Sequence, residues 1–144
     1  MFRFVKSLSR QTVKYYTFLP RNFCDVKSIP IVQFDFVKEK VLKKQLLLVD
    51  VREPIELKEE GKIPNSVNIP LGQIMEAFKM NDSAFQTKYG VTKPNSTSNF
   101  VLTCKSGKRT NTAYATLNEL GYKNIAVYSG SFLDWIERGG PIEK

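Results

Sequence analysis

The 144-residue sequence contains no histidine and only two cysteines, Cys24 and Cys104. Without an imidazole, mechanisms that use a Cys-His or Ser-His pair are excluded, so any nucleophile must be activated in another way. Two widely spaced cysteines do not provide a disulfide framework, and without histidine or a CxxC pair a zinc site is not expected. The chemistry of this chain must therefore come from a small set of residue types.

Long apolar runs are also missing, and acidic residues are missing from one end of the chain. No apolar run approaches the roughly 18 residues that a membrane-spanning helix needs, so stable membrane insertion is not expected. Residues 1–23 contain no acid but five basic residues: Arg3, Lys6, Arg10, Lys14 and Arg21. The remaining 17 basic residues face all 14 acids. Most of the net charge of +8 belongs to this tail, which argues against a nucleic-acid-binding face.

The pattern within residues 1–23 predicts a mitochondrial presequence. Four of the basic residues fall on one face of a helix, and Phe4, Val5 and Leu8 fall on roughly the opposite face. An amphipathic, arginine-containing segment without acids is typical of such presequences, whereas a secretory signal needs a continuous apolar core. A disordered basic tail and a surface-binding helix are the alternatives. We therefore expect a mitochondrial matrix location, with the cytoplasm as the alternative.

The rest of the chain is long enough for one domain and predicts an α/β fold. Short apolar runs that suit strands buried on both faces lie at 31–32, 46–49, 67–69, 100–102 and 125–128. Helical patterns lie at 34–42, 54–60 and 110–120 and around Trp135, and 71–79 and 82–89 are helical or irregular. Strands that alternate with helices predict a parallel sheet flanked by helices.

Two polar residues stand where strands of this predicted sheet end. Asp50 follows the run at 46–49, and Cys104 follows the run at 100–102 after one threonine. In open parallel sheets, ligands bind beyond the carboxyl ends of the strands. The sequence therefore points to one edge of the sheet as the functional site.

The segment after the strand at 100–102 is the strongest candidate site. It consists of Cys104, Lys105, Ser106, Gly107, Lys108 and Arg109. A tight loop between a strand and a helix can turn its backbone N–H groups inward and form an anion-binding nest. Gly107 permits the required backbone conformations, and the three cations add positive potential. This setting favours a negatively charged sulfur on Cys104 and an incoming oxyanion such as thiosulfate.

Four segments, in this order, resemble the motifs of the rhodanese family. Residues 50–54 with Glu56 resemble its Asp-Val-Arg-Glu motif, and residues 61–70 resemble its Gly-x-Ile-Pro-Gly-Ala-x-Asn-Ile-Pro segment. Residues 104–109 match the six-residue active loop, and residues 121–141 resemble the C-terminal signature. The resemblance covers about residues 30–143 and is strongest to single-domain thiosulfate sulfurtransferases. The sequence departs from the family motifs at two places: Asn65-Ser66 replaces the usual Gly-Ala, and Ser129-Gly130-Ser131 replaces a common Gly-Gly. Both departures lie outside the active loop.

The resemblance implies a rhodanese-like fold with a five-stranded parallel sheet. It implies that Cys104 takes sulfur from thiosulfate or a persulfide and holds it as a persulfide. The sulfur then passes to cyanide or to an acceptor thiol, from glutathione or a protein, without a cofactor or metal. Residues 105–109 would bind the donor, while Asp50 and Arg52 would support the rim through hydrogen bonds and ion pairs.

Two other functions remain open from the sequence. Certain phosphatases share the fold and a Cys-to-Arg loop, but five residues separate the two in their loop, whereas four separate Cys104 from Arg109. The position that would carry their arginine is Thr110. This difference argues against a phosphatase or an arsenate reductase. A non-catalytic interaction module is the other alternative, although such domains usually lose the cysteine.

Overall fold

The computed structural model describes residues 28–144, and all five strands form one parallel sheet in the order β1-β5-β4-β2-β3. The strands are β1 (Ile31–Val32), β2 (Leu47–Asp50), β3 (Val67–Asn68), β4 (Phe100–Thr103) and β5 (Ile125–Tyr128). Each lies within about a residue of a run that the sequence indicated. The predicted parallel five-stranded sheet is therefore confirmed, with β4 at its centre.

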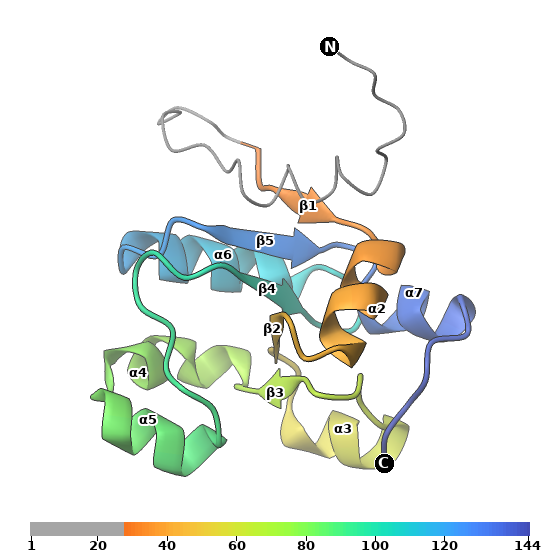
Figure 1. Cartoon of the computed structure of the whole chain (residues 1–144), viewed down its shortest axis with the longest axis horizontal. Coiled ribbons are helices and arrows are strands. Elements are labelled where there is room, and N and C mark those ends of the chain that lie inside the picture. The colour runs from red at the N-terminus through yellow and green to blue at the C-terminus, as the bar shows by residue number, and fades with distance from the viewer. Residues whose placement is uncertain (1–27) are drawn as a thin grey trace.

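Helices connect the strands and cover the sheet (Figure 1). They are α2 (Phe34–Leu42), α3 (Pro54–Glu60), α4 (Ile74–Lys79), α5 (Asp82–Tyr89), α6 (Arg109–Glu119) and α7 (Ser131–Glu137). The pattern at 71–79 is divided into a 3-10 turn, η2 (Leu71–Gln73), followed by α4. Within residues 28–144, no helix combines the length and the apolar character that crossing a membrane requires.

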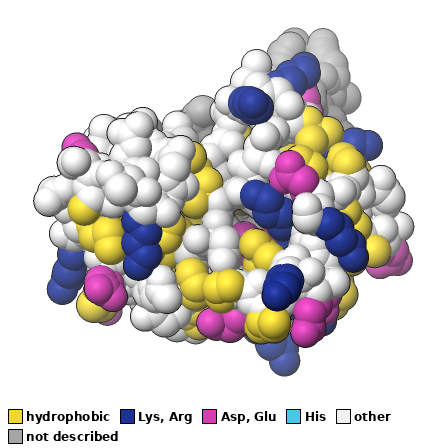
Figure 2. All heavy atoms as spheres, turned by 90° about the horizontal axis from the view of Figure 1, so that it is seen from below, with side chains coloured by type: hydrophobic (Ala, Val, Ile, Leu, Met, Phe, Trp, Pro, Cys, Tyr) yellow, Lys and Arg dark blue, Asp and Glu magenta, His cyan; other side chains and the backbone are white. Residues whose placement is uncertain are grey.

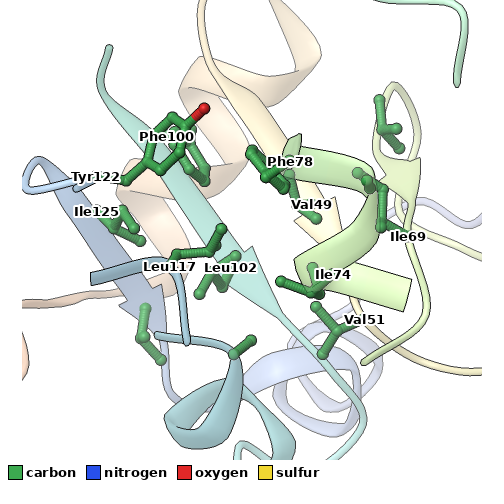
Figure 3. Close-up of a cluster of buried hydrophobic side chains, with 14 of the residues drawn as sticks. Val49, Val51, Ile69, Ile74, Phe78, Phe100, Leu102, Leu117, Tyr122 and Ile125 are labelled. Carbon is green, nitrogen blue, oxygen red and sulfur yellow. The ribbon is translucent and has the colours of Figure 1, made fainter. Parts of the chain in front are cut away.

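Each face of the sheet carries its own hydrophobic core. Val49 and Leu102 pack with Ile74 of α4 and Leu117 of α6 on one face (Figure 3). On the other face, Leu48 and Val101, which precede those two residues in their strands, pack with α2 and α7. Alternate strand residues point to opposite faces, so a strand covered on both sides is buried on both sides and consists mostly of apolar residues. This explains why all four residues of β4 and of β5 are buried.

The same register brings the predicted site residues to one edge. Asp50 is the last residue of β2 and pairs with Thr103, the last residue of β4. Cys104 follows directly, so both candidate residues lie at the carboxyl ends of adjacent strands, as the sequence predicts. Helix α3 begins beside this edge with a capping box between Glu53 and Glu56, and it buries none of its residues. Polar contacts must therefore hold α3 against the domain.

Candidate active site at the 104–109 loop

The thiol of Cys104 lies at the base of the loop that joins β4 to α6. Its exposed fraction is zero, whereas Ser106 and Lys108 are exposed. The backbone N–H of Gly107 donates a hydrogen bond to Cys104 Sγ over 3.0 Å. The hydroxyl of Thr110 donates to the Gly107 carbonyl over 2.8 Å and closes the turn. The loop therefore aims a backbone donor at the sulfur, as an anion-binding nest does.

Gly107 is required at its position by conformation and by space. Its φ of +98° lies in the left-handed region, which residues with a Cβ adopt at a cost. A Cβ at this position would lie 2.2 Å from the carbonyl oxygen of Ser129, which is backbone and cannot swing aside. The glycine thus lets the active loop pass close to the 129–131 segment.

Replacing Gly107 with alanine should reduce both stability and sulfur transfer. We expect a loss of roughly 2 kcal/mol in unfolding free energy and about a tenfold loss in kcat/KM, because the loop must shift away from Ser129. Gly121→Ala is the matched control, since Gly121 has a φ of +100° and nothing within 4 Å of the added Cβ. Urea unfolding and steady-state rates measure the two effects. Equal losses of stability and unchanged rates in both variants would contradict the close-approach explanation.

Ser131 is a site residue that the sequence analysis did not identify. It is fully buried, its φ is +56°, and its Oγ accepts a hydrogen bond from the Cys104 N–H over 3.1 Å. Its hydroxyl donates to the Tyr128 carbonyl over 2.8 Å and lies 3.9 Å from Cys104 Sγ. The departure at 129–131 lies outside the active loop in sequence, yet the fold places it against the thiol. The usable signal was the departure itself, because Ser129-Gly130-Ser131 stands where the family commonly has Gly-Gly.

Two of the three predicted loop cations are already paired with acids of α3. Lys105 Nζ lies 2.7 Å from Glu60 Oε2. The guanidinium of Arg109 forms two hydrogen bonds with the Glu56 carboxylate, at 2.7 and 3.0 Å. Lys108 is exposed and forms no ion pair with the rest of residues 28–144. The sequence places the three cations in one loop, but it does not show that Glu60 and Glu56 of α3 pair with two of them.

The Arg109 pair changes the ionisation of Glu56. Hydrogen bonding from Arg109 lowers the pKa of the Glu56 carboxyl from 4.5 to about 2. The pKa of Arg109 is raised by the same hydrogen bond. Both groups are therefore charged at every pH at which the protein is expected to act, and the link between α3 and the active loop persists.

The Glu56–Arg109 pair should stabilise the protein above pH 4.5, and this contribution should disappear as the pH falls toward 2. The sign follows because the pKa of Glu56 is lower in the folded chain than in the unfolded chain. We expect Glu56→Gln to cost about 1 kcal/mol at pH 6, since both side chains are partly exposed, and much less at pH 3. Urea unfolding at the two pH values measures this difference. Glu59→Gln, an exposed carboxylate of the same helix, is the control; a pH-independent cost for Glu56→Gln would contradict the assignment.

Asp50 and Arg52 form a buried ion pair beneath the rim. Arg52 is fully buried and donates through Nη2 to Asp50 Oδ2 over 2.8 Å and through Nε to both carboxylate oxygens. It also donates to the Gly61 carbonyl, and its guanidinium lies 4.1 Å from the centre of the Phe132 ring. These contacts connect β2, the end of α3 and α7. The predicted supporting role thus has a clear geometric basis.

Comparison with known proteins shows which family the chain belongs to. The family model described as "Rhodanese-like domain" matches residues 34–138. A Schizosaccharomyces pombe relative, whose name includes the words "thiosulfate sulfurtransferase, mitochondrial", is 44% identical over 117 residues, covering 78% of this chain and 82% of the relative. The Saccharomyces cerevisiae protein named thiosulfate:glutathione sulfurtransferase is 36% identical over 118 residues, covering 81% and 84%.

A solved structure agrees with the fold as well. The human single-domain sulfurtransferase TSTD1 superposes with a TM-score of 0.72 at 30% identity, covering 78% of this chain and all of that chain. These matches assign the chain to a family, and the sheet order and the six-residue loop that begins at Cys104 are consistent with that assignment. The chain belongs to the family of rhodanese-like domains.

Proposed function

We propose that this protein is a sulfurtransferase that moves a sulfane sulfur from thiosulfate or a persulfide to a thiol or to cyanide. The observation that carries the proposal is the position of Cys104. Its sulfur lies in a tight loop at the end of the central strand, 3.0 Å from the Gly107 amide, within a rhodanese-like domain. A thiolate that accepts a hydrogen bond from a backbone N–H is suited to nucleophilic attack on a sulfur atom.

In the first step, the Cys104 thiolate attacks the outer sulfur of thiosulfate. A new S–S bond forms to Cys104, the S–S bond of thiosulfate breaks, and sulfite leaves with the bonding electron pair. The product is a persulfide on Cys104 that carries one negative charge. The Gly107 N–H lies close enough to stabilise negative charge on the sulfur chain during this step. Because Cys104 is fully buried, the donor reaches it only after part of its surroundings moves aside.

In the second step, an acceptor thiolate attacks the outer sulfur of the Cys104 persulfide. The acceptor becomes a persulfide and the Cys104 thiolate is regenerated, so charge and atoms balance without a cofactor. The names of two relatives, from Saccharomyces cerevisiae and human, include glutathione as a substrate, which supports a low-molecular-weight thiol acceptor. Protein thiols and cyanide can react in the same way.

A direct assay separates this proposal from the two alternatives. Purified protein should release sulfite from thiosulfate when glutathione is added, and should form thiocyanate when cyanide is the acceptor. A non-catalytic module would do neither. A phosphatase or arsenate reductase would instead hydrolyse an aryl phosphate or reduce arsenate.

We also propose that residues 1–23 are a mitochondrial presequence, which lies outside the described residues. The acid-free composition supports this proposal, and Arg21-Asn22-Phe23 resembles the Arg-x-Phe pattern before matrix-peptidase cleavage sites. We expect import into the matrix and a new N-terminus within about residues 20–25. N-terminal sequencing of the endogenous protein, with fractionation of cells that express a C-terminally tagged copy, tests this. An intact Met1 in the cytosol would defeat the proposal and leave a basic tail.

A further inference from the structure

Helix α3 presents two carboxylates to the active loop, one at each end of the loop. Glu56 and Glu60 are four residues apart on α3 and therefore share a face. Glu60 contacts Lys105, directly after the thiol, and Glu56 contacts Arg109 at the start of α6. In Figure 1, α3 lies at the bottom of the molecule, and Figure 2 shows the molecule from below. Basic and acidic side chains lie next to one another on this face.

The two pairs differ in how easily they separate. The Glu56–Arg109 pair has two short hydrogen bonds, and the pKa of Glu56 is held at about 2. The Glu60–Lys105 pair has one contact of 2.7 Å, and its side chains are 34% and 39% exposed. Lysine carries its charge on a flexible stem and can change partner at little cost. Of the two paired loop cations, Lys105 is therefore the one that an incoming anion can recruit more easily.

We propose that Glu60 competes with anionic sulfur donors for Lys105 and thereby sets how strongly the site prefers donors with more negative charge. This inference rests on the proposed function and adds a residue that determines donor preference. In the resting protein, Glu60 occupies the Lys105 ammonium. When thiosulfate enters the loop, it must displace this carboxylate before Lys105 can bind it. Glu60 keeps its contact with Arg52 at 3.4 Å, so it has a partner after the exchange.

Removing the charge of Glu60 should therefore strengthen thiosulfate binding. An exposed ion pair of this kind contributes modestly, so we expect Glu60→Gln to lower the KM for thiosulfate about threefold. The KM for an aryl thiosulfonate, which delivers the same outer sulfur but carries one negative charge where thiosulfate carries two, should fall by a smaller factor. The effect should shrink when the salt concentration rises from about 20 to 500 mM, because exposed charges are screened.

Glu59→Gln is the matched control because it removes the same charge from the neighbouring position of α3. Glu59 is exposed and forms no ion pair within residues 28–144. Long-range electrostatics alone would change the thiosulfate KM equally in both variants. A larger decrease in Glu60→Gln than in Glu59→Gln supports direct competition, whereas equal values overturn it. An equal decrease for the aryl thiosulfonate would also overturn it.

A double-mutant cycle of Glu60 and Lys105 separates the interaction between the two side chains from the effect that each substitution has on its own, including any effect on folding. Lys105→Gln should raise the thiosulfate KM, and adding Glu60→Gln to it should then lower the KM no more than Glu59→Gln does, since no Lys105 ammonium remains to be released. A larger decrease in the double variant would contradict the proposal. The two hypotheses fail differently. If the wild-type protein transfers no sulfur, the proposed function is wrong; if it transfers sulfur but Glu60→Gln behaves like Glu59→Gln, only this inference is wrong.

Discussion

Replacing Cys104 with serine is expected to reduce sulfur transfer at least about 1,000-fold, with both glutathione and cyanide as acceptors. Only a thiolate can form the persulfide that links the two half-reactions. Serine is nearly isosteric, and its hydroxyl can still accept the hydrogen bond that Gly107 donates to Cys104 Sγ. The fold should therefore remain intact, and the loss should appear as a loss of turnover. Thiocyanate formation and sulfite release measure it.

Cys24→Ser is the matched control, because it removes the other sulfur of the chain and leaves the loop unchanged. We expect this variant to retain wild-type rates. Thermal unfolding of both variants shows whether a rate change follows from a change in stability. Substantial residual activity in Cys104→Ser, together with a large loss in Cys24→Ser, would move the nucleophile to the tail and invalidate the site described above.

Asp50→Ala should be the most destabilising of the changes considered, at about 3–5 kcal/mol of unfolding free energy. The variant leaves the guanidinium of Arg52 fully buried without its principal counter-charge. The remaining partners, the Gly61 carbonyl and a 3.4 Å contact with Glu60, do not replace a bidentate carboxylate. Burying an unpaired charge is the cause of the cost. Urea unfolding of the purified protein measures it.

Two further variants show whether the loss of stability in Asp50→Ala comes from the unpaired buried charge of Arg52 or from any removal of a charged side chain. Glu39→Ala breaks an exposed pair with Lys43, at 3.5 Å, and should cost less than about 0.5 kcal/mol. Adding Arg52→Met to Asp50→Ala removes the stranded charge and should recover part of the lost stability. If the double variant were less stable than Asp50→Ala alone, the cost would lie in packing rather than in the unpaired charge.

The sequence predicted the sheet well because the strands are buried on both faces. A strand such as β4, with four buried residues, consists mostly of apolar residues, and such runs are visible without a structure. Helix α3 was predicted with its observed bounds because Pro54 suits its first turn and Gly61 follows its last residue. The division of 71–79 into η2 and α4 was not predicted, since both conformations suit the same apolar spacing.

The sequence indicated site residues where they are adjacent in the chain or stand at the ends of predicted strands, as Asp50 does. The 104–109 loop is continuous, so its cysteine, glycine and cations could be read together. Ser131 lies 27 positions after Cys104, and Glu60 lies 45 positions before Lys105. Their contacts depend on how α7 and α3 pack around the sheet edge, and composition and spacing do not contain that information. For this reason, the neutralisation of Lys105 and Arg109 became evident only in three dimensions.

In the proposed mechanism, Cys104 itself carries the transferred sulfur. Mass spectrometry of the protein after treatment with thiosulfate, followed by digestion without reductant, locates this sulfur. We predict an increase of about 32 Da on the peptide that contains Cys104, and its removal when glutathione or cyanide is added. An unmodified Cys104 peptide under conditions of active turnover, or the added sulfur on Cys24 alone, would contradict the account.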